Sequence, residues 1–118
     1  NMTEQTIATV HRLSDFRRRS KLVCFSRQEL TLLLSVYSRR VISGEWKAYA
    51  IDHRHNMAQF SIFTNAHAQP VYSIVKFATS SRRKRKYAVN KGPAKVAEAD
   101  VLTQALAYFG RGLRLVST

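Results

Sequence analysis

The sequence predicts an α+β fold, in which an antiparallel sheet of about four strands packs against two amphipathic helices on one face. Three observations indicate this fold: a helix-start pattern at residue 26, a change to alternating apolar spacing at residue 46, and a return to helical spacing after residue 93. The chain has 118 residues, of which 45% are hydrophobic, so it can bury one core. We predict one domain, residues 25–110, between a flexible basic N-terminal arm (1–24) and a C-terminal tail (111–118).

The first helix is predicted to begin at a capping box formed by Ser26 and Glu29. In this motif the side chain of each residue accepts a hydrogen bond from the backbone N–H of the other. Apolar side chains then recur at helical spacing, at Leu30, Leu33, Leu34, Tyr37 and Val41. Gly44 is predicted to end the helix. Leu32 and Val36 lie off this stripe, so we expect the helix to be covered on a second side by the arm or by a second copy.

From Trp46 onward the apolar residues alternate, which is typical of strands with one buried face. The predicted strands are residues 46–53, 58–64, 71–77 and 87–89. After Gly92 and Pro93 the spacing predicts a second helix with Asp100 as its N-cap. The expected element order is therefore α-β-β-β-β-α. Because the two helices are about enough to cover one face of the sheet, the other face should be open.

The net charge of +13 is concentrated in two short stretches. Residues 82–95 carry a net +7 and residues 1–25 a net +3. The predicted phosphate contacts are Arg82, Arg83, Lys84, Arg85 and Lys86, with Lys91 and Lys95 beside them and with Arg17, Arg18, Arg19 and Lys21 as a second clamp. Five consecutive cations in a hairpin loop repel one another, and a row of phosphates relieves that repulsion. The alternative is a merely solvated loop.

Aromatic side chains supply candidates for stacking on nucleic-acid bases. Tyr49, Phe63, Tyr72 and Tyr87 fall on four different predicted strands, so they would form a platform if they shared the open face of the sheet. The alternative is that most of them are core residues or cross-strand pairs. The sequence alone leaves both interpretations open.

The sequence contains no recognisable catalytic motif. Asp52, His53 and His55 lie near a turn, but His11 and His67 fall in the arm and a loop, so a complete metal site is not expected. We therefore predict no enzyme activity, no cofactor and no metal. The single cysteine, Cys24, cannot form an intramolecular disulfide; it fits a reducing compartment and is interpreted as a small buried hydrophobe. No apolar run is long enough to cross a bilayer, so we expect a cytoplasmic protein without a membrane partner.

Several short motifs resemble a family of small alphaproteobacterial proteins that is filed as a domain of unknown function. The resemblance covers roughly residues 25–109 and rests on Phe25-Ser26-Arg27-Gln28-Glu29-Leu30, Gly44-Glu45-Trp46, Tyr49-Ala50-Ile51-Asp52, Tyr72 with Ile74 and Lys76, and Tyr87-Ala88-Val89. It implies a bacterial cytoplasmic protein and supplies no activity or ligand.

In topology alone, the element order is similar to the double-stranded-RNA-binding domain. The four strands and the lack of a lysine cluster at the start of the second helix depart from that domain.

These features favour a non-enzymatic module that binds DNA, RNA or another polyanion through the basic loop. A regulatory role is one form of this hypothesis. The alternative is a protein-interaction module. In that case Leu32 and Val36, or the open sheet face, would dock a partner, and the basic loop would meet an acidic protein surface. An open sheet edge would also allow two copies to pair as a homodimer.

Overall fold

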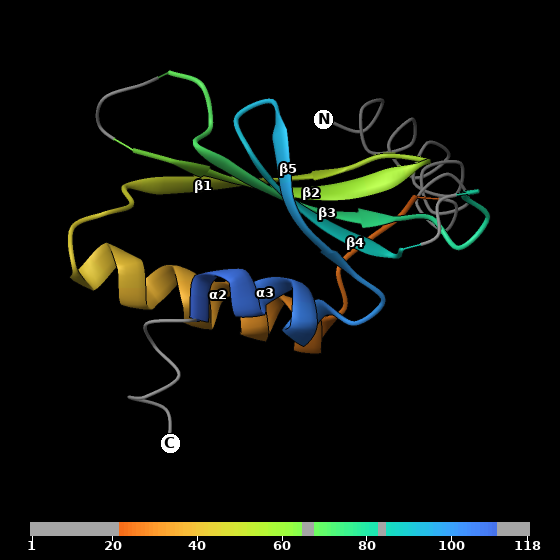
Figure 1. The fold of residues 1–118 in the computed structure, drawn as a ribbon, viewed down its shortest axis with the longest axis horizontal. Helices are drawn as coiled ribbons and strands as arrows, with labels where there is room; N and C mark the ends of the chain where they lie inside the picture. Colours follow the sequence, from red (N-terminus) through yellow and green to blue (C-terminus); the bar gives the residue numbers. More distant parts are fainter. Residues whose placement is uncertain (1–21, 65–67, 83–84, 111–118) are drawn as a thin grey trace, which may run out of the picture.

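The computed structural model describes residues 22–64, 68–82 and 85–110, which form a sheet layer and a helix layer (Figure 1). The sheet has five antiparallel strands whose spatial order follows the chain, β1-β2-β3-β4-β5. The elements are α2 (Arg27–Ile42), β1 (Ala48–His53), β2 (Met57–Phe63), β3 (Tyr72–Phe77), β4 (Tyr87–Lys91), β5 (Ala94–Ala99) and α3 (Leu102–Gly110). The predicted α+β class and two-layer arrangement are confirmed, with five strands instead of four.

Helix α2 begins and ends as its sequence predicts. The Ser26 Oγ accepts a hydrogen bond from the Glu29 N–H at 3.1 Å, and the Glu29 Oε1 accepts one from the Ser26 N–H at 2.7 Å. Gly44 follows the C-cap with φ of 85°, a conformation that favours glycine. Of the two residues off the apolar stripe, Val36 packs against the core and Leu32 is exposed.

The sequence pattern did not predict β5. Its residues are mainly Ala, Lys and Glu, which favour helix over strand, so local preference pointed away from the observed structure. Antiparallel pairing with β4 outweighs that preference. The turn contained a usable signal, because Gly92 has φ of 57° and glycine in the first position of a two-residue loop is typical of a type II′ hairpin. Pro93 suits the second position, where φ is negative.

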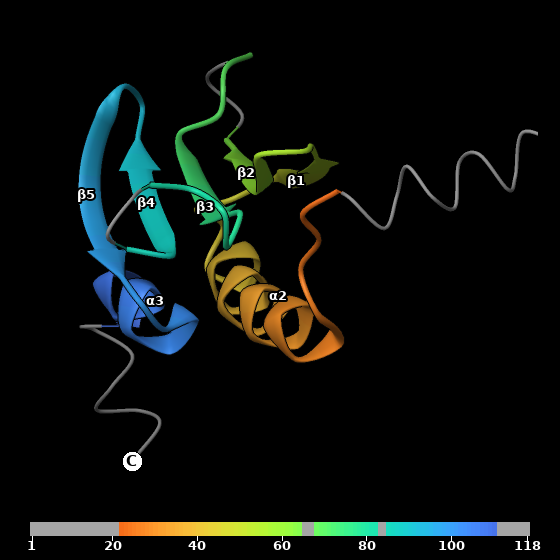
Figure 2. The ribbon, with the colours of Figure 1, turned by 90° about the vertical axis from the view of Figure 1, so that its right-hand side faces the viewer.

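The core lies between the sheet and the two helices (Figure 2). On the helix-facing side, Phe60 lies opposite Ile74 and Ile74 opposite Val89, and all three are at most 1% exposed. Arg40 of α2 links the two helices at the edge of the core. Its Nη2 donates to the Phe109 carbonyl oxygen at 2.7 Å, and its guanidinium carbon lies 5.5 Å from the centre of the Trp46 ring. Within residues 22–64, 68–82 and 85–110, both helices lie on this side of the sheet and none covers the opposite face.

Some predictions fall outside the described residues or need correction. The arm is described only at residues 22–24, and the tail 111–118 lies outside the described part entirely. Asp100 precedes α3 by two residues, and its carboxylate accepts a hydrogen bond from Arg85, while the Val101 carbonyl accepts from the first turn of the helix. Asp100 is therefore not the N-cap of α3. No helix in the described part of the chain has the length and apolar character needed to cross a membrane.

Candidate nucleic-acid interface

Three segments meet at one end of the sheet: the β1–β2 turn, the β3–β4 loop and residues 22–26, which lead into α2 (Figure 1). The Ala78 N–H donates to the Asn56 carbonyl oxygen at 3.0 Å and joins the loop to the turn. The Val23 N–H donates to the Arg54 carbonyl oxygen at 2.8 Å and joins the third segment to the same turn. We call this surface the basic end. Its exposed positive or titratable side chains are Arg27, Arg54, His55, Arg82, Arg85 and Lys86.

A half-buried polar network of Glu29, Lys76 and Tyr87 lies next to the basic end. The Lys76 Nζ donates to the Glu29 Oε1 at 2.8 Å and to the Cys24 carbonyl oxygen at 2.7 Å, and the Tyr87 hydroxyl donates to the other Glu29 oxygen. The network thus ties the start of α2 to β3 and β4. Lys76 shares the inward face of β3 with Ile74, and a lysine at such a position was a signal that sequence reasoning missed.

Protonation of this network follows from its geometry. Partial burial alone would raise the pKa of Glu29, but hydrogen bonds from Lys76 and Tyr87 outweigh it and hold that pKa below its ordinary value of 4.5. Burial and the adjacent carboxylate raise the pKa of the Tyr87 hydroxyl. At neutral pH, Glu29 is therefore ionised and Tyr87 remains a hydrogen-bond donor.

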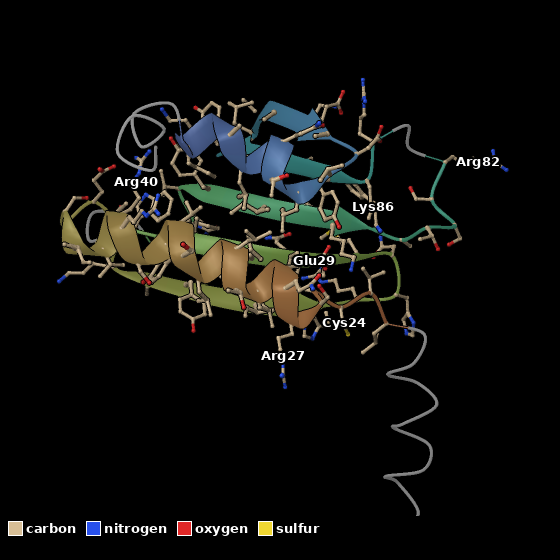
Figure 3. All side chains as sticks on the ribbon, turned by 90° about the horizontal axis from the view of Figure 1, so that it is seen from below. Cys24, Arg27, Glu29, Arg40, Arg82 and Lys86 are labelled. Carbon is tan, nitrogen blue, oxygen red and sulfur yellow. The ribbon has the colours of Figure 1, made fainter. Side chains whose placement is uncertain are left out.

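The carboxylates near the basic end are largely paired. Glu29 is paired with Lys76, and the Asp100 Oδ2 lies 3.1 Å from the Arg85 Nη1. Arg82 and Lys86 form no ion pair with any carboxylate in residues 22–64, 68–82 and 85–110. Figure 3 shows Arg82 extending away from the body of the domain. The basic end therefore presents uncompensated positive charge to a ligand.

The β3–β4 loop is the hairpin connection that the sequence predicts, and its base is fixed by hydrogen bonds. The Phe77 N–H donates to the Lys86 carbonyl oxygen at 2.8 Å, and the Ser81 N–H donates to the Ala78 carbonyl oxygen at 3.0 Å. Arg83 and Lys84 lie outside the described residues, as do Arg17, Arg18, Arg19 and Lys21. The second predicted clamp joins the described chain at Leu22, beside the basic end.

A hollow of about 460 Å³ opens between these segments. Its lining includes His55, Thr79, Ser80 and Lys86, so hydroxyl groups and positive or titratable groups face a common space. Cys24 also lines it and is exposed, which corrects its interpretation as a buried hydrophobe. Such a lining suits an anion with several oxygen acceptors, because ammonium, imidazole and hydroxyl groups all donate hydrogen bonds.

Two of the predicted phosphate contacts lie elsewhere. Strand β4 runs from Tyr87 at the basic end to Lys91, which is roughly 14 Å away at the rise of an antiparallel strand. Lys91 and Lys95 flank the β4–β5 turn and are exposed, and Lys95 forms an ion pair with Glu98. They are close to the basic run in sequence but do not join it in space.

The predicted stacking residues do not form one platform. By the pairing registers, Tyr49, Tyr72 and Tyr87 share the helix-facing side of the sheet with Phe60, whereas Phe63 points to the opposite side. Tyr87 is buried, and Tyr49 stacks on Phe60 with ring centres 5.0 Å apart. The single platform is therefore not formed, because Phe63 lies on the side of the sheet opposite the other three rings.

The remaining candidates for chemistry were Asp52 and His53 at the end of β1 and His55 in the β1–β2 turn. Asp52, His53 and His55 are all exposed. The described ranges contain no cluster of three or more His, Cys, Asp or Glu side chains suited to holding a metal ion. Nothing in this turn resembles a paired acid and base around a pocket.

The fold and the site together define a small α+β domain with a basic end and a sheet face that neither α2 nor α3 covers. Residues 23–99 match the family described as "Protein of unknown function (DUF2794)". The match spans more than half of the chain, so the protein belongs to this family, and the expectation of a family of unknown function is confirmed. Searches of curated proteins and of solved structures gave no match.

Proposed function

We propose that this protein is a non-enzymatic module that binds nucleic acid through phosphate contacts at the basic end. The observation that carries the proposal is the state of the charges there. Arg82 and Lys86 are exposed without a carboxylate partner in the described part of the chain, while Glu29 and Asp100 are already paired. A phosphate backbone would supply the missing counter-charges and release condensed cations on binding.

The loop favours this function because its base is already ordered. Hydrogen bonds close the β3–β4 hairpin at Phe77 and Lys86, and the Glu29–Lys76–Tyr87 network holds the strands beneath it. Ordering the loop on a ligand would therefore cost less entropy than ordering an unrestrained basic segment. Phosphate contacts of this kind fix position without reading sequence, so the basic end alone would bind many sequences.

The surroundings of Glu29 and His55, two titratable groups near the basic end, argue against catalysis. Glu29 is held ionised by Lys76 and Tyr87 and caps α2, so it is poorly suited to exchange protons with a substrate. His55 lines the hollow but has no carboxylate beside it in the described residues to orient its ring. We therefore expect binding without turnover.

An acidic protein surface is the competing ligand, and competition against DNA distinguishes the two. Labelled duplex DNA of mixed sequence would be bound by the protein and displaced by unlabelled DNA or by polyglutamate, matched in charge concentration. We expect DNA to displace the label at the lower charge concentration, because duplex DNA is densely charged and releases a condensed counterion layer on binding. Polyglutamate that competed equally well would favour the protein-interaction function.

A further inference from the structure

The sheet face turned away from the helices has a hollow of about 450 Å³. Gln59, Val75 and Ala88 lie in one row across three strands, and Val75 and Ala88 are each only 3% exposed although neither α2 nor α3 covers this face. Val75 and Ala88 form an apolar floor, and the lining around it includes Gln59, Phe77 and Asn90. The volume falls within the roughly 300–1,000 Å³ that is common for small-ligand sites.

The concave shape comes from the last hairpin. The pairing of β4 with β5 shifts register between Val89 and Asn90, and such irregularities bend a strand and increase its twist. Gly92, Pro93 and Lys95 of this hairpin line the hollow. The strand that the sequence did not predict therefore creates one wall of the site.

Phe77 connects the two hollows. It lines the hollow on the open face and also the hollow at the basic end, where Lys86 and Thr79 are its neighbours in the lining. Phe77 is half-buried. A ligand that placed a phosphate at the basic end would thus bring its next chemical group to this ring.

Polar groups on the open face are held in place. The Gln59 Nε2 donates to the Ser61 Oγ at 3.0 Å and to the Ser73 Oγ at 3.4 Å, and Asn90 lies opposite Ser73 in the sheet. Amides can both donate and accept hydrogen bonds, as the edges of nucleobases do. The face also carries carboxylates, Asp52 on the first edge strand and Glu98, which is paired with Lys95.

We propose that the open face binds the unpaired bases of single-stranded nucleic acid, with one base stacked on Phe77 and Gln59 and Asn90 at base edges. This inference rests on the proposed function and names its ligand class. A planar base fits a floor of small apolar residues beside an aromatic ring, and unstacked bases are accessible only in single strands. Cations lie at both ends of this face: Lys86 lines the neighbouring hollow together with Phe77, and Lys95 lines the hollow of the open face at the β4–β5 turn.

The test compares three labelled ligands of equal length by fluorescence anisotropy at one salt concentration: oligothymidylate, an abasic strand and a mixed-sequence duplex. We expect oligothymidylate to bind most tightly. Phe77→Leu, which keeps apolar bulk but removes the ring, should weaken its binding about tenfold and leave the abasic strand unaffected. Phe63→Leu is the matched control, because Phe63 is on the same face but lines neither hollow. It should bind as the parent does.

The outcomes separate this inference from the proposed function. Equal affinity of the parent for all three ligands, or an unchanged Phe77→Leu variant, would overturn the base-stacking site and leave phosphate binding intact. The three-ligand comparison on the parent protein stands even if the variant folds poorly. If none of the ligands binds, both proposals fail.

Discussion

Replacing the loop cations with Gln or Ser is expected to weaken duplex DNA binding roughly a hundredfold or more at physiological salt, because most phosphate contacts would be lost. The replaced residues are Arg82, Arg83, Lys84, Arg85 and Lys86. Each lost contact should also make the salt dependence shallower by about one unit of log-log slope. Stability should hardly change, since the described members are exposed and the Arg85–Asp100 pair is open to solvent. Anisotropy titrations and urea unfolding measure the two effects.

The arm provides the comparison. Replacing Arg17, Arg18, Arg19 and Lys21 should have the smaller effect on binding, because the sequence predicts a flexible arm and ordering such a segment on the ligand offsets part of what its charges contribute. A loop variant that bound DNA as tightly as the parent, beside an arm variant that lost binding, would show that the loop is only a solvated hairpin.

Lys76→Met is expected to lower the free energy of unfolding by about 2–3 kcal/mol, because it leaves the Glu29 carboxylate poorly compensated in a half-buried position. The two side chains are 16% and 13% exposed, so water replaces the lost contact only in part. Lys95→Met is the matched control. It removes the ion pair between Lys95 and Glu98, whose two side chains are 49% and 45% exposed, respectively. The free energy of unfolding should therefore change by no more than about 0.5 kcal/mol. Equal losses in urea unfolding would contradict the role of the network.

The same network gives the protein an acid-sensitive contribution to stability. The pKa of Glu29 is lower in the folded protein than its ordinary value of 4.5, so its contribution is present above pH 4.5 and is lost as pH falls through the folded-state pKa. In Glu29→Gln that part of the pH dependence should be absent, although the variant is less stable at neutral pH. Matched slopes of unfolding free energy against pH in both proteins would show that Glu29 is not the titrating group.

Local signals predicted the local features of this fold. The Ser26–Glu29 capping box and Gly44 act within a few residues of α2, so the sequence alone indicated both ends of the helix. Strand β5 depends on pairing with β4, which overrides the helical preference of its own residues. The turn at Gly92 was the one local indication of that pairing.

The candidate site was predictable only in part, because it depends on contacts between distant residues. The basic loop appeared in the sequence as five consecutive cations, and its position between β3 and β4 was predicted correctly. The Glu29–Lys76 pair joins residues 47 positions apart, and no local pattern indicates such a contact. The stacking prediction required knowing which face the helices cover. Because the helices pack on the side of the sheet that carries Tyr87, Tyr87 is buried and Phe77 lies on the open face.

The most direct test of phosphate binding at the basic end is the salt dependence of the affinity for mixed-sequence duplex DNA. Neutralisation of five to seven phosphates predicts a log-log slope of about −4 to −6. A measured slope in this range would agree with binding through the loop cations and their neighbours. A slope near zero would contradict the account, because a complex that releases no counterions cannot be held by phosphate contacts at Arg82, Lys86 and the cations around them.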